Sequence, residues 1–413
     1  MRLYRAQRDS ARKPVNAKYA ILGFISSGTY GRVYKAMSRD DGEGQLYAIK
    51  KFKPDKEGEM PTYTGVTQSA AREIALNREI KHENIIALRE VMLEDKSIYM
   101  VFEYAEHDFL QVIHHHATGL IRSVPTAVLK SLMFQLLNGV QYLHSSHILH
   151  RDLKPANILI TSKGVVKIGD LGLARLVQNP LQPLSYGDKV VVTIWYRAPE
   201  LLMGARHYTK AIDCWAIGCI LGEMLSLRPM FKGEEAKLDS KKNVPFQRDQ
   251  VVKIVEVLGT PDPSRWPGLL HMPEYQNLAR IERYKPALPA WCRGKALSSA
   301  GVEFMNQLLD YNPTTRLNAR EALQHRWFQE DPVPTANAFA TVLPQNAYPV
   351  RRVSNDEATN MVAPTASRAP TGNSYSGFPR LTGVAGGTNV QGTGGGAGSG
   401  GSTTTARKRA RLE

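Results

Sequence analysis

The sequence predicts an α+β protein with two lobes, a small β-rich lobe followed by a larger helical lobe. Residues 19–105 hold short runs rich in β-branched and aromatic residues, whereas residues 106–328 show the i, i+3, i+4 apolar spacing of amphipathic helices. The chain has 413 residues, 42% of them hydrophobic, which is enough for two or three structural units with a sizeable core. Because ligands usually bind in the crevice between two such lobes, we expect a functional site there.

The small lobe is predicted to consist of strands with one helix among them. The expected strands are residues 19–25, 32–37, 46–52 and 98–104, and the expected helix is residues 68–80. A basic N-terminal arm, residues 1–18, precedes the first strand and carries six Lys or Arg against one Asp. The globular domain is therefore expected over residues 19–328, with its small lobe at 19–105.

The large lobe, residues 106–328, is predicted to be mostly helical. In its longest helix, 124–144, apolar residues such as Leu129, Leu132 and Leu136 recur at helical spacing, and further helices are expected at 213–225 and 301–309. After residue 328 the composition shifts to Pro, Asn, Ala, Thr and Ser, and then to Gly. Residues 329–413 are therefore expected to form a low-complexity, disordered tail with a basic end.

Composition and charge exclude several classes of protein. No uncharged apolar run reaches the roughly 18 residues that a membrane span needs, so no membrane partner is expected. The three cysteines show no C-x-x-C spacing, which argues against a disulfide framework or a zinc site. The net charge is +15, with much of the excess in the N-terminal arm and at 407–411. This distribution favours targeting and docking, and direct nucleic-acid binding is not expected.

A glycine-containing segment between the first two predicted strands is the first candidate binding element. Gly28 and Gly31 would let backbone N–H groups approach a phosphate closely. A hairpin turn fits the same residues equally well and stays open. A dinucleotide-binding loop is excluded, because a strand rather than a helix follows the glycines. The candidate nucleotide-binding residues here are Ile25, Ser26, Ser27, Gly28, Thr29, Tyr30, Gly31, Arg32 and Val33.

Lys50, at the end of the Tyr-Ala-Ile-Lys run in the third predicted strand, is a candidate phosphate-binding cation. The alternative is an ordinary solvated lysine, the commoner fate of this residue type. The candidate partner is Glu73, in the predicted helix 68–80. A helix that moves Glu73 toward or away from Lys50 would switch the site on or off.

The strongest signal is the run H-R-D-x-K-x-x-N at residues 150–157, followed by D-x-G at 170–172. With the glycine segment, Lys50, Glu73 and A-P-E at 198–200, these motifs stand in the order found in eukaryotic protein kinases, and the chain resembles that family over about residues 19–328. The resemblance implies a bilobal protein kinase fold. It also implies transfer of the γ-phosphate of ATP, with Mg²⁺ as the cofactor.

The resemblance assigns a role to each motif residue. Asp152 would accept the proton of the substrate hydroxyl, and Lys154, which marks serine/threonine kinases, would neutralise charge on the moving phosphoryl group. Asn157 and Asp170 are oxygen ligands suited to Mg²⁺. Leu171 replaces the usual Phe of the D-F-G motif. The residues expected around the adenine are Phe102, Glu103, Ala105 and Leu159.

The segment 193–200 resembles the cyclin-dependent kinases within this family. In those relatives Arg197 and the preceding residues 191–192 suit a proline after the phosphoacceptor. Glu200 is expected to pair with Arg316. The mitogen-activated kinases fit less well, because no T-x-Y lies between Asp170 and Glu200.

The runs S-A-A-R-E at 69–73 and Y-A-E-H-D at 104–108 narrow the resemblance to the Mediator-associated cyclin-dependent kinases. The insertion at 57–67 fits as well. Such kinases pair with cyclin C, work with the Mediator kinase-module subunits in the nucleus, and phosphorylate the C-terminal repeats of RNA polymerase II and transcription factors. In these relatives the N-terminal arm packs on the cyclin as a helix, and a disordered arm is the equal alternative.

Arg72, Arg151 and Arg175 match three arginines that converge on a phosphothreonine in relatives. At the position where those relatives carry this threonine, seven residues before Trp195, the chain has Asp188. We expect the Asp188 carboxylate to occupy this anion pocket as a built-in substitute, although a solvated loop aspartate would explain the residue alone.

Two other functions remain open. A pseudokinase scaffold would lack the lysine or one of the two aspartates, and Lys50, Asp152 and Asp170 are all present. A cell-cycle kinase, or another transcriptional cyclin-dependent kinase, would be distinguished by the cyclin that it binds.

Overall fold

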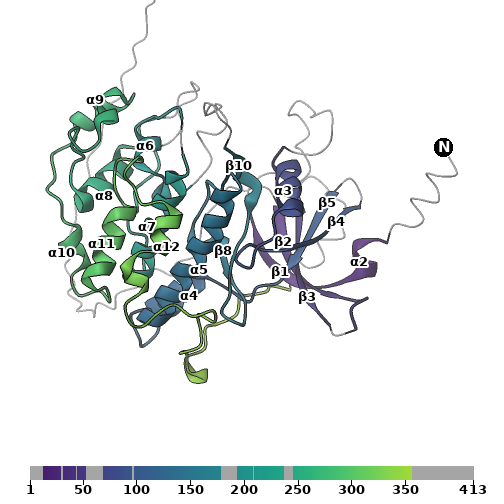
Figure 1. The fold of residues 1–413 in the computed structure, drawn as a ribbon. Coiled ribbons are helices and arrows are strands. Elements are labelled where there is room, and N and C mark those ends of the chain that lie inside the picture. The colour runs from purple at the N-terminus through teal and green to yellow at the C-terminus, as the bar shows by residue number, and fades with distance from the viewer. Residues whose placement is uncertain are drawn as a thin grey trace, which may run out of the picture. The chain divides into compact units, whose positions relative to one another are not determined.

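The computed structural model describes residues 13–28, 31–42, 44–52, 68–94, 97–177, 193–207, 209–236 and 245–355. Its small lobe is a five-stranded antiparallel sheet with the order β1-β2-β3-β5-β4 (Figure 1). The strands are β1 (Tyr19–Ser27), β2 (Gly31–Ser38), β3 (Leu46–Phe52), β4 (Leu88–Glu94) and β5 (Ser97–Glu103). The α+β class and the two lobes are confirmed.

Alternate residues of the central strands serve the two faces of this sheet. Ile49 and Val101 belong to one apolar cluster, and their neighbours Ala48 and Met100 belong to the other. This is the period of two expected for a strand buried on both faces. The second cluster also contains Ala70 of α3 (Gln68–Glu79), so this helix covers the face that bears Ala48.

The large lobe is built around two long helices, α5 (Thr126–Ser145) and α7 (Ala211–Ser226). Almost every residue of α7 is buried, which explains a sequence that is apolar around the whole helix. The other helices are α4 (Phe109–Thr118), α6 (Pro199–Leu202), α8 (Arg248–Leu258), α9 (Tyr275–Ala279), α10 (Leu288–Cys292), α11 (Ser299–Leu308) and α12 (Ala319–Leu323). Among the described residues, no helix is long and apolar enough to cross a membrane.

Two small sheets lie at the junction of the lobes. One has the order β6-β8-β9 and consists of β6 (His107–Asp108), β8 (Ile158–Ile160) and β9 (Val166–Ile168). The other pairs β7 (Ile148–Leu149) with β10 (Arg175–Leu176). Short 3₁₀ turns at Pro155–Asn157 and Leu171–Leu173 overlap the two motifs at 150–157 and 170–172. The motif residues therefore stand on tight turns beside short strands.

The predicted strands and helices are confirmed to within a few residues, and several elements were missed, among them β4, α4 and α8. Strand β4 contains Arg89 and Glu90 and shows no clean alternation of buried and exposed residues. Helix α4 carries a run of three histidines, and α8 follows residues 237–244, which lie outside the described part.

The N-terminal arm is described only from Lys13. There α2 (Val15–Lys18) packs on the small lobe: Val15 is buried and its N–H donates to Glu94 at 2.7 Å, while the Lys18 ammonium lies 2.8 Å from Glu90. This part of the arm is folded against β4. Residues 1–12 lie outside the described residues.

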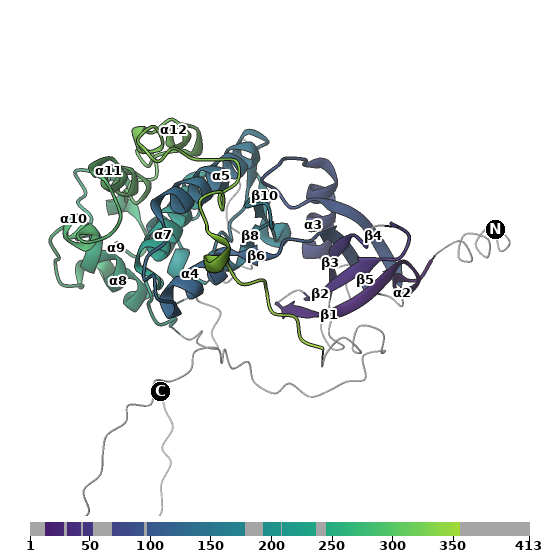
Figure 2. The ribbon, with the colours of Figure 1, turned by 90° about the horizontal axis from the view of Figure 1, so that it is seen from below.

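The expectation that a disordered tail begins at residue 329 is wrong for residues 329–355. Ala338 and Tyr348 are buried in the core of the large lobe, and Lys130 of α5 donates to the Glu330 carbonyl at 2.7 Å. In Figure 2 this yellow-green segment runs from α12 past α4 toward β1. Scattered apolar side chains and backbone hydrogen bonds order it despite its loop-like composition. Residues 356–413, with the basic run 407–411, lie outside the described residues.

Candidate active site between the lobes

Lys50 of β3, Glu73 of α3 and Asp170 form one ion cluster between the lobes. The Lys50 Nζ lies 2.8 and 2.7 Å from the two carboxylate oxygens of Glu73 and 3.0 Å from Asp170 Oδ1. Glu73 is buried, so α3 is turned inward with its carboxylate on the lysine. The predicted Lys50–Glu73 pair is therefore formed, and the alternative of a solvated lysine is wrong.

Burial and charge act against each other in this cluster. Burial alone would lower the pKa of Lys50, but the carboxylates of Glu73 and Asp170 outweigh it and raise that pKa. Burial would raise the pKa of Asp170, but the lysine lowers it. For Glu73, burial dominates the opposing effect of Lys50 and raises its pKa to about 7. The ionised lysine and Asp170 thus stay charged while Glu73 is poised near neutral pH.

We expect kcat/KM to fall as the pH drops below about 7, because Glu73 then takes up a proton and releases Lys50. A raised carboxyl pKa means that the folded protein favours the neutral form, so the ion pair is lost on the acid side of that pKa. The check is a pH profile of kcat/KM for the wild type and for Glu73→Gln. The profile of the variant should lack the fall in kcat/KM at low pH. An unchanged fall would contradict its attribution to protonation of Glu73.

Asp152 lies at the centre of a short hydrogen-bonded loop. Its Oδ2 accepts from Lys154 Nζ at 2.8 Å and from Asn157 Nδ2 at 3.1 Å. Its Oδ1 is buried and has no hydrogen-bond partner within the described structure. Since a buried carboxylate oxygen without a partner is costly, this atom is suited to accept a hydrogen bond from a ligand hydroxyl.

The loop is anchored by Asp213, which sequence reasoning missed. This buried carboxylate of α7 accepts from the backbone N–H groups of His150 at 3.0 Å and Arg151 at 2.9 Å, and from His144 Nε2 at 2.9 Å. Burial would raise the pKa of Asp213, but the bond and charge of His144 lower it. Arg151 has a φ of 69°, which these bonds stabilise. An acidic residue in the first turn of a mostly apolar helix was the available signal.

Asn157 and Asp170 are suited to hold a divalent metal ion. Asn157 uses its amide N–H₂ on Asp152, so its amide oxygen is left for a cation, and the Gly169 N–H donates to the Asn157 carbonyl at 2.9 Å, next to Asp170. Among the described residues no group of three His, Cys, Asp or Glu could hold a metal. Phosphate oxygens of a nucleotide would have to complete the coordination.

Two of the four predicted adenine-binding residues, Phe102 and Leu159, lie in or against one apolar cluster. Phe102 and Ala48 of the small lobe belong to it, and Ile25, Val33 and Leu159 pack against it. Leu159 comes from β8, so it closes this cluster from the large lobe.

Polar contacts of Glu103 and Ala105 hold the segment that joins the two lobes in place. Glu103 accepts from the backbone N–H of Ala87 at 2.7 Å and pairs with Lys167 at 2.9 Å. The Ala105 carbonyl accepts from Arg351 Nη2 at 2.6 Å. We call residues 102–106 the hinge.

The two glycines of the predicted phosphate-binding segment differ. A Cβ on Gly31 would lie 2.4 Å from the Lys51 carbonyl oxygen, so this glycine is needed for the close approach of β2 and β3. A Cβ on Gly28 would meet nothing within 4 Å, and the Gly28 N–H already donates to the Gly31 carbonyl at 2.9 Å. Ser26, Ser27 and Arg32 pair within β1 and β2, whereas Thr29 and Tyr30 lie outside the described residues.

The three predicted anion-binding arginines lie on three separate segments, namely helix α3, the loop after β7 and strand β10. Arg72 Nη1 donates to the Gly172 carbonyl at 3.1 Å, Arg151 follows His150 in the anchored loop, and Arg175 pairs with Leu149 across β10 and β7. Asp188 lies outside the described residues, so its part in this pocket stays a prediction.

The predicted Glu200–Arg316 pair is confirmed. Two parallel bonds of 2.8 Å join the guanidinium to the carboxylate, and both side chains are buried. Arg316 also donates to the carbonyls of Asp310 and Ala211. The pair fixes α6 to the segment that precedes α12.

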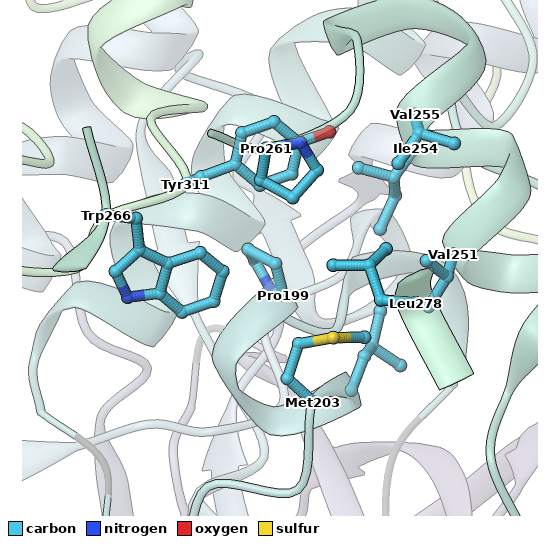
Figure 3. Close-up of a pocket in the computed structure, with 10 residues that line it drawn as sticks. Pro199, Met203, Val251, Ile254, Val255, Pro261, Trp266, Leu278 and Tyr311 are labelled. Atoms are coloured by element: carbon cyan, nitrogen blue, oxygen red, sulfur yellow. The ribbon is translucent and has the colours of Figure 1, made fainter. Parts of the chain in front are cut away.

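An apolar pocket in the large lobe lies beside α6, and none of the predicted nucleotide-binding or catalytic residues lines it. Figure 3 shows side chains including Pro199, Met203, Trp266 and Tyr311 facing it. Its free volume is about 10 Å³, which is at most one water molecule. It is a packing void and not a second ligand site.

A lysine held by a helix glutamate, an aspartate with an unpartnered oxygen, and a neighbouring Asn–Asp pair define a site of the protein kinase class. The protein kinase domain model matches residues 19–328, and the chain belongs to that family. It is a serine/threonine kinase, whose family uses ATP and a divalent metal ion.

The relatives carry the same name in several fungi. The chain is 55% identical to "Serine/threonine-protein kinase SSN3" of Yarrowia lipolytica, over 86% of this chain and 87% of the relative. It is 55% identical to ssn3 of Neosartorya fischeri, over 83% and 84%. It is 49% identical to SSN3 of Mycosarcoma maydis, over 86% of this chain and 66% of that longer relative.

Proposed function

We propose that this chain is a cyclin-dependent kinase that transfers the γ-phosphate of ATP to Ser or Thr of transcription proteins. It is the kinase subunit of Mediator, it works in the nucleus with a cyclin C-like cyclin and the other kinase-module subunits, and its substrates are the C-terminal repeats of RNA polymerase II and transcription factors. The observation that carries catalysis is the buried, unpartnered Oδ1 of Asp152 beside Lys154.

The geometry of the site supports a role for each of these residues. Asp152 orients the target hydroxyl through Oδ1 and takes its proton as the oxygen attacks the γ-phosphorus, while the bond from that phosphorus to the bridging oxygen of the β-phosphate breaks and ADP leaves. Lys154, 2.8 Å from the other carboxylate oxygen, neutralises charge on the transferred group. Lys50 holds the α- and β-phosphates. Asn157 and Asp170 would hold Mg²⁺, which supplies charge neutralisation on the phosphates when bound.

The proposal of a cyclin partner rests on α3. This helix carries both Glu73, which holds Lys50, and Arg72, which contacts Gly172 in the activation segment (residues 170–200). A protein that binds α3 would therefore set two parts of the site at once. The relatives bear the name SSN3, which supports the Mediator type over a cell-cycle kinase.

The type of cyclin-dependent kinase is tested by purifying the tagged chain from cells and identifying the cyclin bound to it. A cyclin C-like protein is expected, and a cell-cycle cyclin would overturn the Mediator assignment. Incubation of that complex with Mg²⁺, ATP and polymerase C-terminal repeats should label Ser or Thr. Absence of labelling on any protein would leave the scaffold as the remaining function.

We expect activity without phosphorylation of the activation segment, because Asp188 supplies an anion to Arg72, Arg151 and Arg175. A carboxylate brings one negative charge where a phosphate brings about 1.5–2, so the pocket is held less tightly and the kinase depends more on its cyclin. The measurement is turnover of the unphosphorylated complex before and after treatment with an activating kinase. A rise of about a hundredfold or more would contradict the prediction.

Removal of residues 406–413 is expected to abolish nuclear accumulation, because the basic run 407–411 fits an import signal. The check is imaging of the tagged full chain against the shortened chain. Unchanged nuclear accumulation would remove the role of this run.

A further inference from the structure

The segment after α12 forms a second connection between the lobes, beside the hinge. We call residues 348–354 the strap. On the large lobe, the strap begins at Tyr348, which is buried and whose hydroxyl lies 3.0 Å from Nε2 of His116 on α4. The Pro349 carbonyl then lies 2.9 Å from Nδ1 of His107 on β6. These contacts fix one end of the strap.

The middle of the strap is bound to the hinge. The backbone N–H of Arg351 donates to the Glu106 carbonyl at 2.8 Å, and its guanidinium donates to the Ala105 carbonyl at 2.6 Å. The same guanidinium lies 5.4 Å from the centre of the Tyr104 ring. Three successive hinge residues are therefore held from outside the segment that joins the lobes.

The far end of the strap pairs with the strand that leads to the glycine segment. Ser354 exchanges two backbone hydrogen bonds of 2.8 Å with Phe24 of β1. β1 is the first strand of the sheet, so Ser354 covers its outer edge. These two bonds hold β1 four residues before Gly28.

Gly23 makes this contact possible. A Cβ there would lie 2.3 Å from Val353 Cγ1 and 2.9 Å from the Ser354 carbonyl oxygen. A side chain at position 23 would therefore push the strap away from β1. The sequence of β1 is fitted to the strap as well as to the sheet.

We infer that the strap positions the hinge and β1 for nucleotide binding and slows nucleotide release. Its residues act through Ala105, Glu106 and Phe24, so they are positioning residues. The inference rests on the kinase activity of the family alone and needs neither the cyclin nor the Mediator assignment.

The test compares Ser354→Pro with Ser354→Ala in the full-length chain. Proline removes the N–H that donates to Phe24, whereas alanine keeps it. The probe is a fluorescent ADP with Mg²⁺, displaced by excess ATP. Ser354→Pro should speed ADP dissociation ~3–10-fold, the effect of losing one to two backbone hydrogen bonds. The alanine variant should stay within about twofold.

Steady-state kinetics give a second readout. Ser354→Pro should raise the KM for ATP and leave kcat and the melting temperature nearly unchanged, a split that a purely structural role would not produce. Unchanged ADP dissociation in Ser354→Pro, or an equal change in both variants, would overturn the inference.

Gly23→Ala tests the same contact from the other side. The added Cβ should displace the strap and speed ADP release in the same direction. Gly42→Ala is the matched control, because a Cβ at Gly42 would meet nothing within 4 Å. Should Gly23→Ala fold poorly, the Ser354 pair alone decides the outcome.

Discussion

Asp152→Asn is expected to lower kcat by about 10²–10⁴-fold while Mg²⁺–ATP binding stays close to that of the wild type. The amide keeps the size of the side chain and can still meet Lys154 and Asn157, but it cannot take a proton from the target hydroxyl. The loss should therefore fall on the chemical step. The measurement is single-turnover transfer to a protein substrate, together with nucleotide binding by titration.

The matched control for this substitution is Asp262→Asn. Asp262 is a turn residue that accepts from the backbone N–H of Ser264 at 2.9 Å, far along the chain from the site. Its variant should transfer phosphate at the wild-type rate. Wild-type transfer by Asp152→Asn would exclude this residue as the base. Loss of cyclin binding in the variant would show that the substitution disturbs more than the chemistry.

Arg316→Met is expected to cost about 3–5 kcal/mol of the free energy of unfolding. The substitution leaves the Glu200 carboxylate buried and unpaired, and it removes the donors to the Asp310 and Ala211 carbonyls. Methionine fills much of the space of the arginine side chain. The loss of stability therefore reflects the buried polar groups left without a partner rather than a cavity. Chemical denaturation of the full chain measures it.

An exposed ion pair provides the control. Arg326 pairs with Glu303 at the surface, with side chains 63% and 43% exposed. Arg326→Met should cost less than about 1 kcal/mol, because exposed pairs contribute little. Equal losses of unfolding free energy in the two variants would mean that burial does not determine how much the Glu200–Arg316 pair stabilises the fold.

The sequence predicted the parts of the site whose residues lie in motifs, and missed the parts that support them. Lys50, Glu73 and the Asp152 loop were predicted because each lies in a short motif of charged residues beside glycines or a strand. These motifs follow one another along the chain in the order found in protein kinases. Asp213 was missed because it acts through backbone N–H groups, which leave no mark on the sequence of the loop that it holds. Its burial depends on the packing of α7, which spacing alone does not reveal.

The strap was missed for a different reason. Its composition is that of a loop, and its order comes from contacts with residues more than 200 positions earlier, such as His116 and Phe24. Local patterns describe a segment's own preferences and carry no information on such distant partners. Strand β4 was missed because Arg89 and Glu90 interrupt its alternation, although Glu90 accepts from Lys18 and Tyr19.

The outer edge of β1 has a practical consequence for protein production. The family match ends at Phe328, an obvious place to cut a recombinant kinase domain. A chain cut there would lack Ser354, and the N–H and C=O of Phe24 would face solvent. Bare strand edges invite pairing between copies, so such a fragment would be prone to self-association in concentrated solution.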